Sequence, residues 1–117
     1  MKRDDDLIRD LLFKYEGDAD WIALMPGGTS SSTGQEEKEH YHVLLMSDQG
    51  LVTSVGPDSF RVTASGHDYI NAIRSDTIWR KAKEGAKEIG GATFGILKDL
   101  AVAYLKQEAA IKLGLEL

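Results

Sequence analysis

The sequence contains no cysteine and only two prolines, and its uninterrupted apolar runs are a few residues long. The absence of cysteine excludes disulfides, thiolate metal ligands and cysteine nucleophiles, and it fits the reducing cytoplasm, where we expect the protein. The short apolar runs exclude a membrane span, which needs about 18 consecutive apolar residues. Three aspartates, Asp4 to Asp6, stand where a secretory signal would need an apolar run, so we expect neither an export signal nor a membrane partner.

The composition sets the scale of the fold and the sign of its charge. A chain of 117 residues with 42% hydrophobic residues fits one domain. Its formal net charge of −5 repels duplex DNA on average. The distribution of charge along the chain therefore matters more than the total.

Helical spacing, alternation and end signals predict an ordered series of short elements. They are a helix at 4–16, a strand at 20–24, a helix at 33–49, strands at 51–55 and 60–63, and helices that begin after Thr63, Ser75 and Thr93.

The second helix has the clearest boundaries. Thr33 and Glu36 have the spacing of a capping box, and Gly50 is placed to end the helix. We expect its apolar side to consist of Tyr41, Val43, Leu44, Leu45 and Met46. The preceding Gly27–Gly34 segment lacks the spacing and the lysine of a phosphate-binding loop, so we interpret it as a mobile loop.

A helix followed at once by a two-strand hairpin is typical of winged-helix proteins. We therefore predict an α+β fold of winged-helix type, mainly helical, with a small antiparallel β-hairpin as the wing and two additional C-terminal helices. We expect residues 1–75 to form the winged-helix core and 76–117 a helical extension packed on it, within one domain overall. In the hairpin, Phe60 and Val62 should point inward and Arg61 outward.

Several segments also resemble a known family. The resemblance lies in Met1–Arg9, in Tyr41–Val52 with its helix-to-strand junction, in Val62–Ile70 after the wing, in Ile73–Trp79 and in Leu97–Ala101. These segments are similar to a family of short, uncharacterised bacterial and prophage proteins, a domain of unknown function. The resemblance spans most of the chain and implies a fold and a phage-associated context, but no reaction.

The sequence offers no catalytic or metal-binding pattern. His40 and His42 are two residues apart, which places them on different faces of a helix. Glu36 and His40 have i,i+4 spacing, but no third ligand follows at a spacing typical of zinc sites. We therefore expect no catalytic residues, no metal and no cofactor, and we predict that the protein is not an enzyme.

The second helix and the wing are the predicted partner-binding surface. Residues 33–49 contain Lys38 as their only Lys or Arg, against four Asp and Glu residues. Carboxylates at this end of a recognition helix oppose binding to phosphates, so nucleic acid is disfavoured and a protein partner is expected. The residues assigned to this surface are Gln35, Glu36, Glu37, Lys38, Glu39, His42 and Arg61.

Positive charge and surplus apolar residues both lie in the later helices. We define a basic patch of five residues, for which an ordinary solvated face is the competing interpretation: Arg74, Arg80, Lys81, Lys83 and Lys87. The last helix has apolar residues beyond one stripe, and either a second copy of the chain or the protein's own domain would cover them. The residues assigned to a homodimer interface are Phe94, Leu97, Leu100 and Tyr104.

Two functional hypotheses follow. The first is a non-enzymatic accessory protein of phage or prophage type that binds a protein through its acidic helix and wing, and that inhibits host nucleic-acid-handling or defence machinery. The alternative is a dimeric winged-helix transcriptional regulator that binds DNA.

Overall fold

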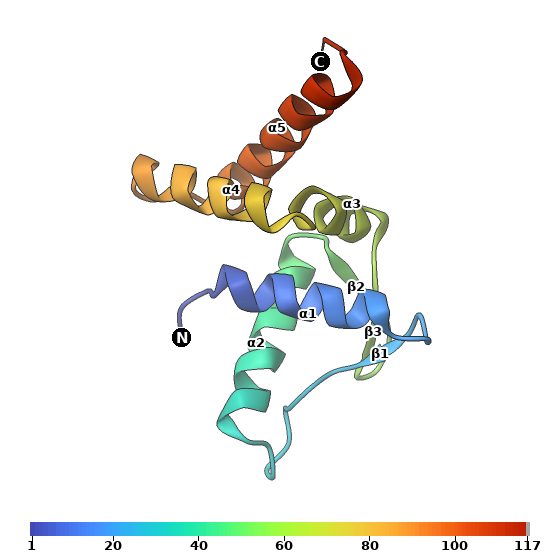
Figure 1. Cartoon of the computed structure of the whole chain (residues 1–117). Coiled ribbons are helices and arrows are strands. Elements are labelled where there is room, and N and C mark those ends of the chain that lie inside the picture. Colours follow the sequence, from blue (N-terminus) through green and yellow to red (C-terminus); the bar gives the residue numbers. More distant parts are fainter. Residues whose placement is uncertain (117) are drawn as a thin grey trace. The chain divides into compact units, whose positions relative to one another are not determined.

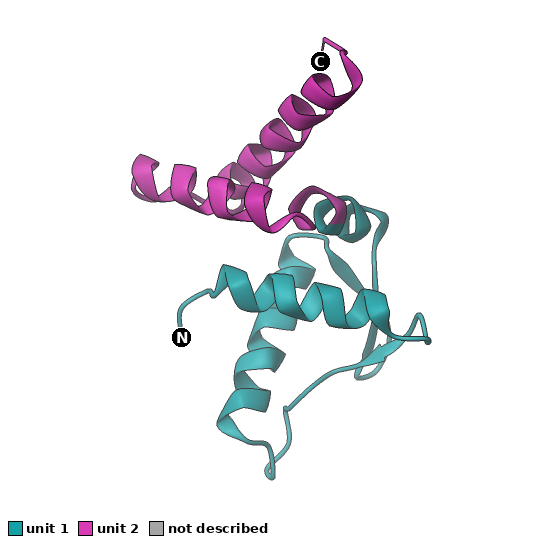
Figure 2. Ribbon diagram, viewed as in Figure 1, with its two compact units in different colours: residues 1–70 teal, residues 71–117 magenta. Residues whose placement is uncertain are grey.

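The computed structural model describes residues 1–116, which form five helices and a small three-stranded sheet, so the predicted α+β class is confirmed (Figure 1). The chain divides into two compact units, unit 1 (Met1–Ile70) and unit 2 (Asn71–Leu117) (Figure 2). This division falls inside a helix, before the boundary at residue 75 that we predicted. The elements in chain order are α1 (Asp5–Gly17), β1 (Ala23–Leu24), α2 (Gly34–Asp48), β2 (Val52–Gly56), β3 (Ser59–Val62), α3 (Ala64–Ile73), α4 (Asp76–Ile89) and α5 (Phe94–Leu113).

The predicted helix starts are confirmed because each depends on a local capping bond. Thr33 and Glu36 form the predicted capping box at the start of α2. The Thr63 hydroxyl accepts a hydrogen bond from the Gly66 amide at 3.0 Å, at the start of α3. Ser75 and Thr93 cap α4 and α5 in the same way. Such side chains satisfy amides that have no partner within the helix.

The sheet has the strand order β1-β3-β2, and both pairs are antiparallel. The hairpin turns at Asp58, which has a positive φ of 59°. As predicted, Phe60 is buried and Arg61 is exposed. The predicted strand at 20–24 is too long, because only Ala23 and Leu24 pair with β3. Trp21 precedes the strand and is 68% exposed.

The core of unit 1 forms where α1 packs on α2 and β3. The buried side of α1 follows the predicted stripe of Ile8, Leu11, Leu12 and Tyr15. The Tyr15 and Phe60 rings meet edge to face with centroids 4.9 Å apart. This contact connects the end of α1 to the middle of the hairpin.

Unit 2 contains α4 packed on α5. The predicted inward-facing residues Ile78, Trp79 and Ala82 of α4 are buried. Gly90, at a positive φ of 74°, ends α4 where a break was predicted. Among the described residues, no helix is both long and apolar enough to cross a membrane.

Candidate functional site

The first turn of α2 presents three of the predicted partner-binding residues to solvent: Gln35, Glu36 and Glu37. Two of them also have local structural roles. The Glu36 carboxylate accepts a hydrogen bond from the Thr33 amide at 3.1 Å, and the Glu37 carboxylate accepts one from the Gly28 amide at 3.0 Å. The acidic start of α2 is therefore exposed, and it also holds the Gly27–Gly34 loop against the helix.

Lys38 and Glu39 are half-buried. The Lys38 ammonium lies 3.1 Å from the carboxylate of Asp4, the residue that caps α1. The hydrogen bond from the Leu7 amide lowers the pKa of Asp4, and Lys38 lowers it further, against the opposing effect of burial. The only Lys or Arg of α2 is thus paired with a carboxylate of its own unit.

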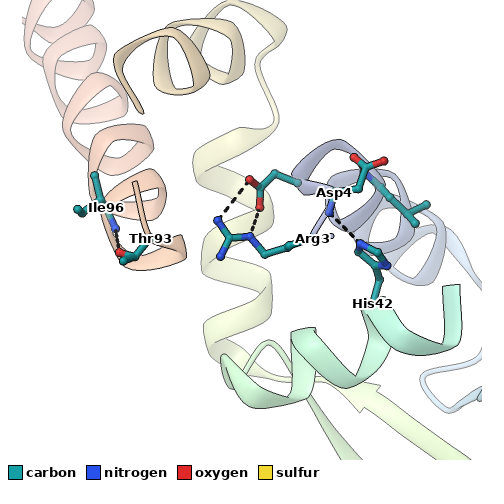
Figure 3. A network of polar contacts seen from close by, with 7 residues as sticks. Arg3, Asp4, His42, Thr93 and Ile96 are labelled. Atoms are coloured by element: carbon teal, nitrogen blue, oxygen red, sulfur yellow. Dashed lines mark hydrogen bonds and ion pairs between the residues drawn. The ribbon is translucent and has the colours of Figure 1, made fainter. Parts of the chain in front are cut away.

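His42 was predicted to bind a partner, and this prediction is wrong, because the residue is 0% exposed. Its Nε2 accepts a hydrogen bond from the Asp4 amide at 2.8 Å (Figure 3). Its Nδ1 lies 2.7 Å from the Lys38 carbonyl oxygen. Because that carbonyl can only accept, Nδ1 carries the proton and the ring is neutral in this arrangement. His42 joins α1 to α2 and does not reach the surface.

The side of α2 opposite this core exposes residues that the sequence analysis did not assign to the site. Tyr41 is 38% exposed and Leu44 is 46% exposed, although both were predicted to be apolar core positions. Val43 and Met46 take the core positions instead, and a helix with 3.6 residues per turn cannot turn all these neighbours to one side. Glu37 lies four residues before Tyr41, and Asp48 lies four residues after Leu44, so both carboxylates are on the same side of the helix as this pair. We name Glu37, Tyr41, Leu44 and Asp48 the outer face of α2.

The burial of His42 is the signal that could have identified this face. Had His42 been treated as a core residue with Val43 and Met46, helical spacing would have placed Tyr41 and Leu44 on the far side.

The β2–β3 hairpin contributes Arg61, which is exposed and whose guanidinium donates to the Val62 carbonyl at 3.3 Å. Arg61 lines a cleft of about 540 Å³ in unit 1 together with Trp21, Asp18, Asp20 and His67. Trp21 was not assigned to any site in the sequence analysis. Its position in a predicted strand concealed the fact that the strand begins two residues later.

The histidines do not gather into a metal site. His40 Nδ1 lies 2.8 Å from the Pro26 carbonyl oxygen, which attaches the loop before α2 to the helix. Within residues 1–116, no group of three or more His, Cys, Asp or Glu side chains is arranged to hold a metal ion.

The predicted basic patch follows the outer side of α4 and the residues before it. Arg80, Lys81 and Lys87 are exposed, and Lys83 lies 5.4 Å from the Trp79 ring. Lys81 lies 5.9 Å from the Tyr104 ring. Arg74 precedes α4 and donates to the Asn71 side chain at 3.1 Å. Helical spacing places Arg80, Lys83 and Lys87 together on one side of α4.

Charge differs between the two units. In unit 1, six Lys and Arg against thirteen Asp and Glu give a formal charge of −7. In unit 2, eight Lys and Arg against six Asp and Glu give +2. The acidic character of the protein thus belongs to the unit that contains α2.

The predicted dimer interface needs correction. Phe94 and Leu97 are 4% and 2% exposed, so they are not available to a second copy. Leu100 and Tyr104 are half-buried and lie near Gly85 of α4. Packing within the protein, the competing interpretation, accounts for this side of α5.

Comparison with known proteins places the chain among relatives without an assigned activity. A family model described as "Hypothetical protein (DUF2513)" matches residues 2–93, up to the residue that caps α5. An "Uncharacterized protein" from Haemophilus influenzae is 31% identical over 96 residues, which cover 74% of this chain and 80% of that protein. No solved structure matches the chain. These matches confirm the predicted relationship to an uncharacterised family.

Proposed function

This chain belongs to the DUF2513 family, and we propose that it is a non-enzymatic protein-binding module that uses the outer face of α2. The observation that carries the proposal is an exposed aromatic and aliphatic pair, Tyr41 and Leu44, between the carboxylates of Glu37 and Asp48. No Lys or Arg lies on this face, and Lys38, on another side of α2, is paired with Asp4.

The spacing of these four residues supports binding of a helix in a groove. Positions i, i+4, i+7 and i+11 of a helix lie along one side, and this is the pattern by which an amphipathic helix enters an apolar groove. Tyrosine is enriched among residues that carry binding energy, since it buries a large area with little loss of side-chain freedom. The partner's groove would have an apolar floor for Tyr41 and Leu44.

Charge complementarity supports a basic rim around that groove. Glu37 and Asp48 flank the apolar pair, and unit 1 as a whole has a formal charge of −7. Complementary charge accelerates the association of two proteins and disfavours partners whose surface has the same sign of charge. A basic groove of this kind is typical of proteins that handle nucleic acid, so an accessory protein of phage type that occupies and inhibits such a groove is the form of the proposal we favour.

The order of elements supports the finer fold assignment. A helix followed directly by a hairpin, with the first strand added beside the third, is the arrangement expected for a winged helix. We propose that α2 occupies the position of the recognition helix and that β2 and β3 form the wing.

The test is capture of a bacterial partner by the tagged chain, followed by affinity measurement with the purified partner. We expect Leu44→Asp to weaken binding by at least about tenfold, and Asp48→Lys to weaken it and to reduce its dependence on salt. Asp10→Lys, an equal charge reversal at an exposed position of α1, serves as the matched control and should bind normally. Binding that survives both α2 changes would show that the outer face is not the interface.

The same topology favours a second candidate, a DNA-binding regulator, because winged-helix folds often have this role. That candidate predicts a mobility shift with duplex DNA that weakens steeply with salt and is lost on Lys38→Ala or Arg61→Ala. The absence of a shift at low salt on any duplex would exclude it.

A further inference from the structure

We propose that the C-terminal half of α5 pairs with the same segment of a second copy of the chain in a two-fold symmetric dimer. Unit 2 contains a groove of about 500 Å³ between the start of α4 and the second half of α5. Ile78, Leu105, Ala109 and Leu113 supply its apolar lining, and Glu108 and Lys112 supply charge. None of these residues belongs to the interface predicted from the sequence, which consists of Phe94, Leu97, Leu100 and Tyr104.

Large apolar side chains are exposed at the end of α5 and just after it. Ile111 is 78% exposed, Leu113 is 68% exposed and Leu115 is 50% exposed. Leu115 is held close to the helix end, since its amide donates to the Ala110 carbonyl at 3.1 Å after Gly114 adopts a positive φ. Apolar surface gathered in this way marks an interaction site, because its exposure to water is unfavourable.

The length of α5 leaves this end uncovered within unit 2. The helix has 20 residues, whereas α4 has 14. Figure 2 shows the C-terminal half of α5 continuing away from α4. The last turns of α5 therefore have no helix of unit 2 beside them along their full length.

A second copy of the chain fits because the groove walls carry exposed apolar side chains of their own, Leu105 at 38% and Leu113 at 68%. In a two-fold dimer each copy presents the same surface, so these apolar walls cover one another. A partner of another kind would need a matching apolar surface of its own. The self-complementary arrangement needs only the residues present here.

Charge favours an antiparallel orientation of the two α5 helices about the two-fold axis. Glu108 and Lys112 form an ion pair of 3.3 Å within α5, and both side chains are exposed enough to reach a neighbour. When two antiparallel copies of α5 cross at the height of Ala110, Glu108 of each copy lies beside Lys112 of the other. A parallel pairing in register would instead bring like charges together.

The experiment is sedimentation equilibrium of the full chain over a wide concentration range. We expect reversible association to twice the chain mass of 12.9 kDa. Glu108→Lys alone and Lys112→Glu alone should each raise the dimer Kd by about tenfold, because symmetry creates two like-charge contacts from one change. The double variant Glu108→Lys/Lys112→Glu restores both pairs and should recover the original Kd.

Lys106→Glu, a charge reversal elsewhere on α5, is the matched control and should leave association unchanged. Circular dichroism establishes that each variant keeps its helical content. A wild-type chain that stays monomeric at millimolar concentration overturns the proposal and leaves the groove to another partner. A dimer that ignores both single reversals, or that the double variant fails to restore, overturns it as well. None of these outcomes depends on binding by the outer face of α2.

Discussion

His42 connects α1 to α2 through hydrogen bonds with main-chain groups, which the sequence pattern does not reveal. Its ring accepts from the Asp4 amide and donates to the Lys38 carbonyl, and it is fully buried. Replacement by phenylalanine keeps an aromatic ring but leaves the Asp4 amide without this acceptor. An unsatisfied buried donor costs about 1–3 kcal/mol, so we expect His42→Phe to lower the free energy of unfolding by that amount.

Urea unfolding at neutral pH measures this loss. His67→Phe, the same change at an exposed position, should alter the free energy of unfolding by less than about 0.5 kcal/mol. Equal stability of the two variants would mean that the hydrogen bonds of His42 contribute nothing.

Tyr15 predicts how stability changes at alkaline pH. Burial, with help from Glu39 and Asp18, raises the pKa of Tyr15 from 10.0 to about 12. Because the folded pKa lies above the unfolded one, the stabilisation is complete below pH 10 and is lost as pH rises from 10 towards 12. Unfolding measured across this range should show a steeper decline for the wild type than for Tyr15→Phe, and parallel curves would contradict the assignment.

Gly66 allows the start of α3 to lie very close to Leu51 and Val62. It lies in the first turn of α3, and a Cβ there would overlap the Leu51 carbonyl oxygen and a methyl group of Val62. The atom of Leu51 at this contact is its main-chain carbonyl oxygen, which cannot move aside without distorting the backbone. We expect Gly66→Ala to destabilise the fold by about 1–3 kcal/mol, despite the better helix propensity of alanine.

Gly95 provides the control for this substitution. It lies in the first turn of α5, is exposed, and has room for a Cβ. Gly95→Ala should therefore raise the midpoint of thermal unfolding slightly, because alanine favours the helix. A Gly66→Ala variant that also gains stability would show that α3 does not depend on this close approach.

The element boundaries could be predicted from the sequence because caps are local. Thr33 with Glu36, Thr63, Ser75 and Thr93 each act within one helical turn, so a few residues suffice to identify each start. The strand at 20–24 was predicted too long because pairing with β3 depends on distant residues.

The orientation of α2 could not be predicted from the same information. Its apolar residues are nearly continuous from Tyr41 to Met46, so periodicity alone does not select a face. A buried histidine decides the matter, because its hydrogen bond from the Asp4 amide requires the start of α1 to lie beside it. Burial of a polar residue depends on tertiary partners, and this is why His42 was assigned to the surface while Tyr41 and Leu44 were assigned to the core.

At the scale of the whole molecule, the division of charge limits what each unit can bind. Unit 1 repels phosphates with a formal charge of −7, and unit 2 carries +2 with Arg80, Lys83 and Lys87 on one side of α4. We therefore expect only weak adsorption to duplex DNA, confined to low salt and due to α4. Three phosphate contacts give a slope of log K against log salt of about −2.7.

The triple variant Arg80→Glu/Lys83→Glu/Lys87→Glu should abolish this adsorption in a mobility shift at low salt. Asp48→Ala, which removes a carboxylate from the outer face of α2, is the control and should leave the slope unchanged, because that face takes no part in the contact. Tight binding that persists at physiological salt, survives the triple change and is lost on Lys38→Ala would require α2 to contact DNA. That result would reverse the preference for a protein partner, since the only Lys or Arg of α2 would then have to leave Asp4 for a phosphate.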